Sequence, residues 1–105
     1  MNTEVRFIPV GYGNSVCANK ILCVLKLKGL VTKRRFAEAK QKNMVIDLTQ
    51  GRATRSLLLM DNGKLIEVAL TAQTVLARLN AKEELLNEAA RMDEEADANG
   101  ETEEI

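Results

Sequence analysis

The chain has 105 residues, of which 46% are hydrophobic and 3% aromatic, enough for one small globular domain with an aliphatic core. It contains no histidine, so the commonest general base and the commonest metal ligand are both missing. Two cysteines cannot close a zinc site by themselves. We therefore expect a protein that is not an enzyme and that uses neither a metal nor another cofactor.

The formal net charge is zero, but the two signs of charge lie in different parts of the chain. Residues 1–82 hold 14 Lys and Arg against 5 Asp and Glu, whereas residues 83–105 hold 1 against 10. This asymmetry favours a polyanionic partner, and the alternative is a solvated surface with a solubilising tail. The sequence predicts a basic α+β domain over 1–82, followed over 83–105 by an acidic helical extension that ends in a disordered tail.

No apolar run is long enough to span a membrane, and the longest, Ile21–Leu25, has the length of a buried strand. The N-terminus lacks the apolar region of a signal peptide. Cys17 and Cys23 lack a C-x-x-C spacing, so we expect both thiols to be buried and reduced. These features predict a cytoplasmic protein without a membrane partner.

The first predicted elements are two strands. Val5–Val10 forms the first, with Pro9 at a sheet edge or a strand end because proline cannot donate a ladder hydrogen bond. Gly11–Asn14 is expected to be a loop. Its G-x-G spacing is shared with dinucleotide-binding turns but lacks their third glycine, which favours an ordinary tight turn. Asn19–Leu25 is the second strand and is apolar enough to be central.

A helix is predicted over 33–43, with Thr32 as its N-cap. Lys33, Arg34 and Arg35 would then lie in its first turn, where cations oppose the helix macrodipole. Such a local conflict is typical of functional sites, so Arg34 and Arg35 become candidates for binding. The alternative is an exposed polar face.

A strand, an arginine-containing loop and a hairpin are predicted between Met44 and Leu70. The strand is Val45–Leu48, and the loop Gly51–Arg55 places two guanidinium groups beside a glycine, where a partner can approach the backbone closely. This loop is the region in which we expect function.

The hairpin is predicted to turn at Asn62–Gly63, because both residues tolerate the positive φ of a two-residue type I′ turn. Such a turn would pair Leu59 with Ile66 and Leu57 with Val68, so that these side chains share one face. The opposite face would then be too apolar to remain in water. We expect this face to be an interface between subunits, formed by Leu58, Met60 and Leu65.

The last predicted element is a second helix, which Thr71 caps at its N-terminus. Its apolar residues recur at helical spacing. They are Val75, Leu76, Leu79, Leu86, Ala89 and Ala90. Beyond Met92 this pattern ends and the composition becomes acidic, so we expect Asp93–Ile105 to be disordered.

Four short motifs occur in one order along the chain: Gly11-Tyr12-Gly13-Asn14, Ala18-Asn19-Lys20, Met44-Val45-Ile46-Asp47 and Gly51-Arg52-Ala53-Thr54-Arg55. Together they resemble the RemA family of small bacterial regulators of extracellular-matrix genes, over about residues 5–80. The resemblance implies a DNA-binding transcriptional regulator without enzymatic activity. It also implies an α+β fold similar to LytTR-type DNA-binding domains, with a small, mostly antiparallel sheet and two helices, assembled into a ring of identical subunits.

The resemblance places the DNA contacts at Lys20 and Arg52. The family usually has arginine at the position of Lys20, which keeps the charge but loses the bidentate fork. Ala53 stands where the family has a second consecutive arginine. We therefore expect either weaker binding to DNA or a larger share of the contacts from Arg55 and the Arg34–Arg35 pair.

The predicted partners are double-stranded DNA and further copies of the chain, with no small-molecule substrate. The scarcity of aromatic residues favours contact with phosphates over readout of bases. Two alternatives remain open. One is a ring-forming scaffold or adaptor that binds other proteins, and the other is RNA binding, for which only Tyr12, Phe7 and Phe36 could stack on bases.

Overall fold

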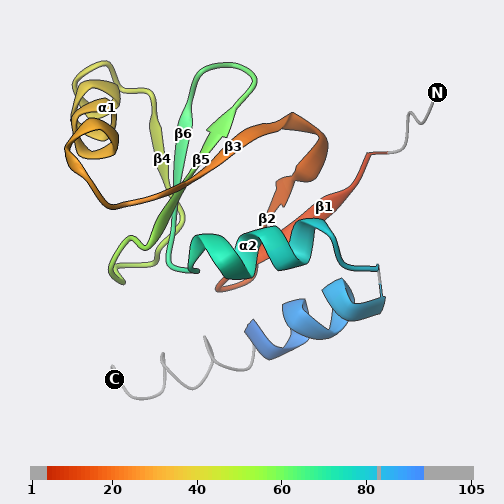
Figure 1. Cartoon of the computed structure of the whole chain (residues 1–105). Helices are drawn as coiled ribbons and strands as arrows, with labels where there is room; N and C mark the ends of the chain where they lie inside the picture. Colours follow the sequence, from red (N-terminus) through yellow and green to blue (C-terminus); the bar gives the residue numbers. More distant parts are fainter. Residues whose placement is uncertain (1–4, 83, 94–105) are drawn as a thin grey trace.

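The computed structural model describes residues 5–82 and 84–93, which form a small α+β domain (Figure 1). This confirms the predicted fold class. The strands are β1 Phe7–Gly11, β2 Asn14–Cys17, β3 Ile21–Lys26, β4 Val45–Asp47, β5 Ser56–Met60 and β6 Leu65–Val68. The helical elements are the short 3₁₀ helix η1 Ala18–Lys20, α1 Leu30–Gln41, α2 Ala72–Leu79 and a further helix over 84–93.

The strands form two sheets. β1 and β2 make a two-stranded antiparallel sheet, and the other four have the order β3-β5-β6-β4. Pairing within the larger sheet is antiparallel except between β4 and β6. β2 was not predicted, since residues 11–14 were expected to lead directly to the next element. β3 was expected to be central but lies at the sheet edge, because β5 and β6 occupy the middle.

The β5–β6 hairpin pairs Leu58 with Ile66 and Leu59 with Leu65, so the predicted pairing is wrong. The Met60 N–H donates to the carbonyl of Lys64 at 2.9 Å, which leaves three residues in the loop. The last of them, Gly63, has a φ of +85°, as expected for a three-residue hairpin loop. The extra loop residue shifts the register by one, which transfers every side chain of β6 to the other face.

The core lies between the four-stranded sheet, the β1–β2 sheet and the C-terminal helices. It consists of Ile8, Val10, Val16, Leu58, Met60, Ile66, Val68, Val75 and Leu86. Leu58 is fully buried there, whereas Leu65 is buried on the opposite side of the sheet. Leu58, Met60 and Leu65 therefore do not share an exposed face, contrary to the expectation on which the predicted subunit interface rested.

Helix α1 begins at Leu30, three residues earlier than predicted, and Thr32 is not its N-cap. Gly29, with a φ of +91°, occupies that position, and its carbonyl accepts from the Lys33 N–H at 3.2 Å. Arg34 and Arg35 consequently lie beyond the first turn, where the macrodipole no longer disfavours them. The predicted conflict is therefore absent for these two arginines, and only Lys33 remains in the first turn.

Thr71 caps α2 as predicted, since its Oγ1 accepts from the Thr74 N–H at 3.2 Å. The helix does not continue to Ala90, however. Near its end the Arg6 guanidinium donates to carbonyl groups at 78, 79 and 81, at 2.7 Å for the carbonyl of Leu79. The chain then reverses, and helix 84–93 runs back beneath α2 (Figure 1).

The helix 84–93, the first part of the acidic extension, packs on the rest of the domain, because Leu86 is only 4% exposed and belongs to the core. Asp93, expected to be disordered, is helical and is the last of the described residues, and the rest of the expected tail lies outside them. Within the part of the chain that the structure describes, no helix has the length and apolar character to cross a membrane.

Candidate nucleic-acid interface

The arginine loop is anchored at its start by a buried threonine. Thr49 is 2% exposed, and its N–H and Oγ1 donate to Oδ1 of Asp47 at 2.9 and 2.6 Å. The Arg52 N–H then donates to the carbonyl of Thr49 at 3.0 Å, closing a turn in which Gln50 and Gly51 both have positive φ. The backbone that carries the exposed Arg52 is therefore fixed.

Asp47 serves this loop as a hydrogen-bond acceptor and not as a partner of Arg52. The hydrogen bonds from Thr49 lower the pKa of its carboxyl group, and the charge of Lys40 lowers it further. Among the described residues, no ion pair joins Asp47 to Arg52. The Arg52 guanidinium is consequently not neutralised by the nearest acidic residue in the sequence.

The β1–β2 turn meets the arginine loop through Tyr12. This residue has a φ of +57° between two glycines, and Cζ of Arg52 lies 5.8 Å from the centroid of its ring. That distance is within the range of a cation–π contact. Two motifs 40 residues apart in the sequence thus form one surface, a contact that the sequence analysis missed.

The end of the loop is tied to β6. Oγ1 of Thr54 donates to Oε1 of the buried Glu67 at 2.6 Å, and the Arg55 N–H donates to the carbonyl of Val68 at 2.9 Å. The Arg55 side chain is exposed. Lys26 is also exposed and faces residue 56 across the β3–β5 pair, so it adds a third cation at this end of the sheet. Its place could not be predicted without the strand register.

Lys20 lies at the other end of β5. Its carbonyl accepts from the Asp61 N–H at 2.8 Å, and its Nζ lies 3.4 Å from Oδ2 of Asp61 in an exposed ion pair. The five residues of β5, about 15 Å of strand, separate this pair from the arginine loop. Within one chain, the structure does not bring Lys20 and Arg52 together. Arg34 and Arg35 lie on α1, and both are exposed.

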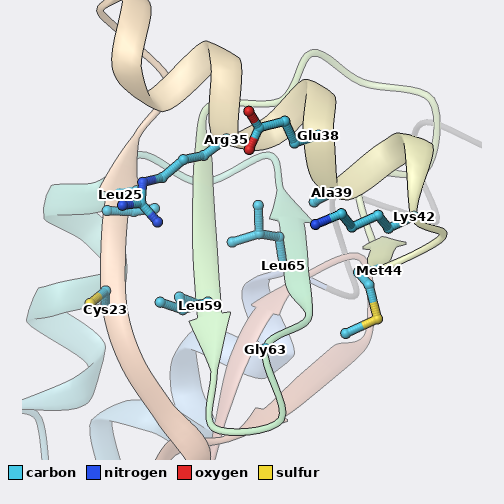
Figure 2. A pocket seen from close by; sticks show the side chains of 10 residues that line it. All are labelled: Cys23, Leu25, Arg35, Glu38, Ala39, Lys42, Met44, Leu59, Gly63 and Leu65. Carbon is cyan, nitrogen blue, oxygen red and sulfur yellow. The ribbon is translucent and has the colours of Figure 1, made fainter.

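A second feature is a groove of about 530 Å³ between α1 and the sheet (Figure 2). Its floor is apolar, with Leu25, Leu59 and Leu65 from three strands, and charged side chains of α1 stand along it, including Arg35. Cys23 also lines the groove and is exposed, so its predicted burial is wrong. Helix α1 buries none of its residues, which leaves this face of the sheet incompletely covered.

Fold and site together define a small α+β protein that presents a basic loop on a rigid backbone. The sequence model of the RemA-like family, described as extracellular matrix regulatory protein A-like, matches residues 7–79, and the chain belongs to this family. This confirms the resemblance found in the motifs. Tyr12 and the arginine loop both lie within the matched region.

Several bacterial relatives carry the name "Putative regulatory protein". One from Carboxydothermus hydrogenoformans is 42% identical over 76% of this chain and 92% of the relative. One from Bacillus cereus strain AH187 is 38% identical over 80% of this chain and 97% of the relative. One from Thermoanaerobacter sp. strain X514 is 35% identical over 88% of this chain and 96% of the relative. The family and these names indicate a regulatory role.

Proposed function

We propose that the protein is a DNA-binding transcriptional regulator whose arginine loop contacts the phosphate backbone. The observation that carries this proposal is the state of Arg52 and Arg55, which are exposed on a hydrogen-bonded backbone. Neither guanidinium has an ion-pair partner among the described residues. An unneutralised guanidinium on a fixed backbone can bind a phosphate without first breaking an ion pair.

Recognition would act on the backbone and shape of DNA more than on its bases. The cations of residues 26, 52 and 55 gather at one end of the sheet, and Tyr12 holds Arg52 from the side. Contacts of this kind position a protein on DNA without reading its sequence. Sequence preference would then come from how easily the DNA deforms.

Assembly into a ring would repeat this modest surface and raise the total affinity. We propose that a second copy covers the groove face. In support, this face is apolar and α1 leaves it open. The chain also exposes large apolar side chains elsewhere: Leu30 is 82% exposed, and Leu22 and Val31 are exposed as well. Exposed apolar surface of this extent is typical of an interface. An assembly would also let Lys20 of one copy and Arg52 of another act on the same DNA.

The sharpest test of DNA contact is Arg52→Ala. We expect weaker binding to any duplex, and a salt slope smaller by about 0.9 for each phosphate that the variant no longer neutralises. Native mass and melting temperature should be unchanged, because the exposed Arg52 side chain lies outside the core. Lys82→Ala removes one charge elsewhere and is the matched control. Wild-type affinity in Arg52→Ala would remove this residue from the site.

Assembly can be tested by Leu25→Glu, which places a charge on the groove floor. We expect sedimentation to show a monomer that still melts cooperatively, while Leu85→Glu, on an exposed leucine of helix 84–93, should leave the oligomer intact. Leu58→Glu would be uninformative, because Leu58 is fully buried in the core. A wild-type protein that is monomeric at tens of micromolar would contradict ring assembly. An oligomer without DNA affinity would favour the scaffold alternative.

A further inference from the structure

Helix 84–93 is fixed at both ends to the rest of the domain. Leu86 anchors its start in the core, and at its end the carboxylate of Asp93 accepts from the Arg78 guanidinium at 2.8 and 3.3 Å. The side chains of this pair are only 16% and 13% exposed. Arg78 also donates to the carbonyl of Pro9 at 3.1 Å, which ties α2, β1 and this helix together. The position of this end of the described helix, at Asp93, is therefore fixed.

That end lies beside the β1–β2 turn. Earlier in the helix, Leu86 and Ala90 line a hollow together with Phe7. Its last turn, at Ala90 and Asp93, lines a smaller hollow with residues 13–15. The next residue along the turn, Tyr12, holds the Arg52 guanidinium on its ring. The helix thus delivers the following segment to the edge of the proposed DNA-binding surface.

The following segment, 94–105, carries six carboxylates and no Lys or Arg. Twelve residues can span at most about 40 Å, which is enough to reach the arginine loop from Asp93. Tethering through so short a connection gives an effective concentration on the order of millimolar, so individually weak ion pairs are sufficient for binding. Asn14, which lines the hollow beside Asp93, also has a buried Nδ2 with no acceptor among the described residues.

We infer that the acidic segment 94–105 binds the surface formed by the β1–β2 turn and the arginine loop, where its carboxylates take the place of DNA phosphates. The competition with DNA rests on the function proposed above. The contact itself rests on where Asp93 lies, beside the β1–β2 turn, and on the opposite charges of the segment and the loop. The chain would then limit its own non-specific binding to DNA.

The test is a full-length variant in which the six carboxylates of the segment become amides. It combines Glu94→Gln, Glu95→Gln, Asp97→Asn, Glu101→Gln, Glu103→Gln and Glu104→Gln. This variant keeps the chain length, whereas removal of everything after Lys82 would also remove Leu86 and Asp93 from the folded body. Hydrogen exchange, read by mass spectrometry, compares it with the wild type in the absence of DNA.

We expect amides at 11–14 and 49–55 to exchange several-fold faster in the variant. The β5–β6 loop at 61–63, at the other end of the sheet, is the internal control and should not change. On non-specific duplex DNA in low salt, the variant should bind about tenfold more tightly, and the difference should shrink as salt screens the charges.

The two measurements separate the two ideas. Equal exchange in both proteins overturns the inference, whether or not either protein binds DNA. Faster exchange confined to 11–14 and 49–55, with no DNA binding by either protein, supports the contact and contradicts the proposed function. Faster exchange with unchanged DNA affinity overturns the competition.

Discussion

The two faces of the four-stranded sheet are covered to different degrees. The face toward α2 and the β1–β2 sheet, which we call the closed face, carries Leu58, Ile66 and Val68 and is sealed from solvent. The face toward α1, the open face, carries Leu25, Leu59 and Leu65 and borders the groove (Figure 2). The main core cluster thus lies on one side of the sheet, whereas the other side buries Leu57 and Leu65 and borders an open groove.

The covering helices explain the difference. Helix α2 places Val75 fully inside the core. Helix α1 has few apolar side chains to offer, and even Phe36 is only half-buried, with Nζ of Lys40 4.2 Å from the centroid of its ring. A narrow apolar stripe cannot seal a sheet of four strands. A charged helix above an apolar floor therefore leaves a groove.

The largest expected effect belongs to the closed face. Leu58→Ala should lower the free energy of unfolding by about 2–5 kcal/mol, because the surrounding core can collapse only partly into the cavity. Urea unfolding of the isolated variant measures this. A loss below about 1 kcal/mol would mean that the closed face is not the principal core.

The closed face should also depend on the ion pair that fixes helix 84–93. Arg78→Met leaves the nearly buried carboxylate of Asp93 without its partner and should cost about 3 kcal/mol, because an uncompensated charge then remains out of water. The double variant with Asp93→Asn removes that charge and should recover part of the loss. Thermal unfolding of the three proteins decides this, and no recovery in the double variant would assign the loss to Arg78 packing alone.

The open face should respond less to truncation. Leu59→Ala removes a half-buried side chain that borders a groove already open to solvent, so no closed cavity forms and the loss should be about 1 kcal/mol. The measurement must be made on the monomer, for example in the Leu25→Glu background. A loss equal to that of Leu58→Ala would abolish the distinction between the faces.

The smallest effect concerns Asp47, whose pKa is lowered from its usual value of 3.8. A carboxylate with a lowered folded pKa stabilises the protein above the unfolded pKa, and this contribution is lost as the pH falls through the folded value. Asp47→Asn should therefore lower the melting temperature slightly at pH 7. The gap to the wild type should narrow below about pH 4. If the difference in melting temperature between the two proteins is constant from pH 7 to pH 3, the charge of Asp47 does not contribute to stability.

Local chemistry could be predicted from the sequence. The Thr71 cap depends on residues three apart, and the arginine loop follows directly from its glycine and its charges. The Asp47-Leu48-Thr49 spacing also carries a signal that could have been used, since aspartate often accepts from the backbone two residues on. Each of these depends on interactions within a few residues.

Long-range pairing could not be predicted. One additional loop residue in the β5–β6 hairpin changed the face of every side chain on β6, and no pattern distinguishes the registers when both faces are apolar. The end of α2 depends on Arg6, more than 70 residues earlier in the chain. The separation of Lys20 from Arg52, and the contact of Tyr12 with Arg52, likewise required the assembled fold.

The parallel pairing of β4 with β6 has a consequence for how the chain folds. β3 and β4 are joined through α1, yet they lie at opposite edges of the sheet, with β5 and β6 between them. The two outer strands therefore belong to one sheet only through the central hairpin, which closes a loop of three residues. Short loops close at the lowest entropic cost. We expect substitutions at Leu58 and Ile66 to slow folding, and those at Val45 in β4 chiefly to speed unfolding.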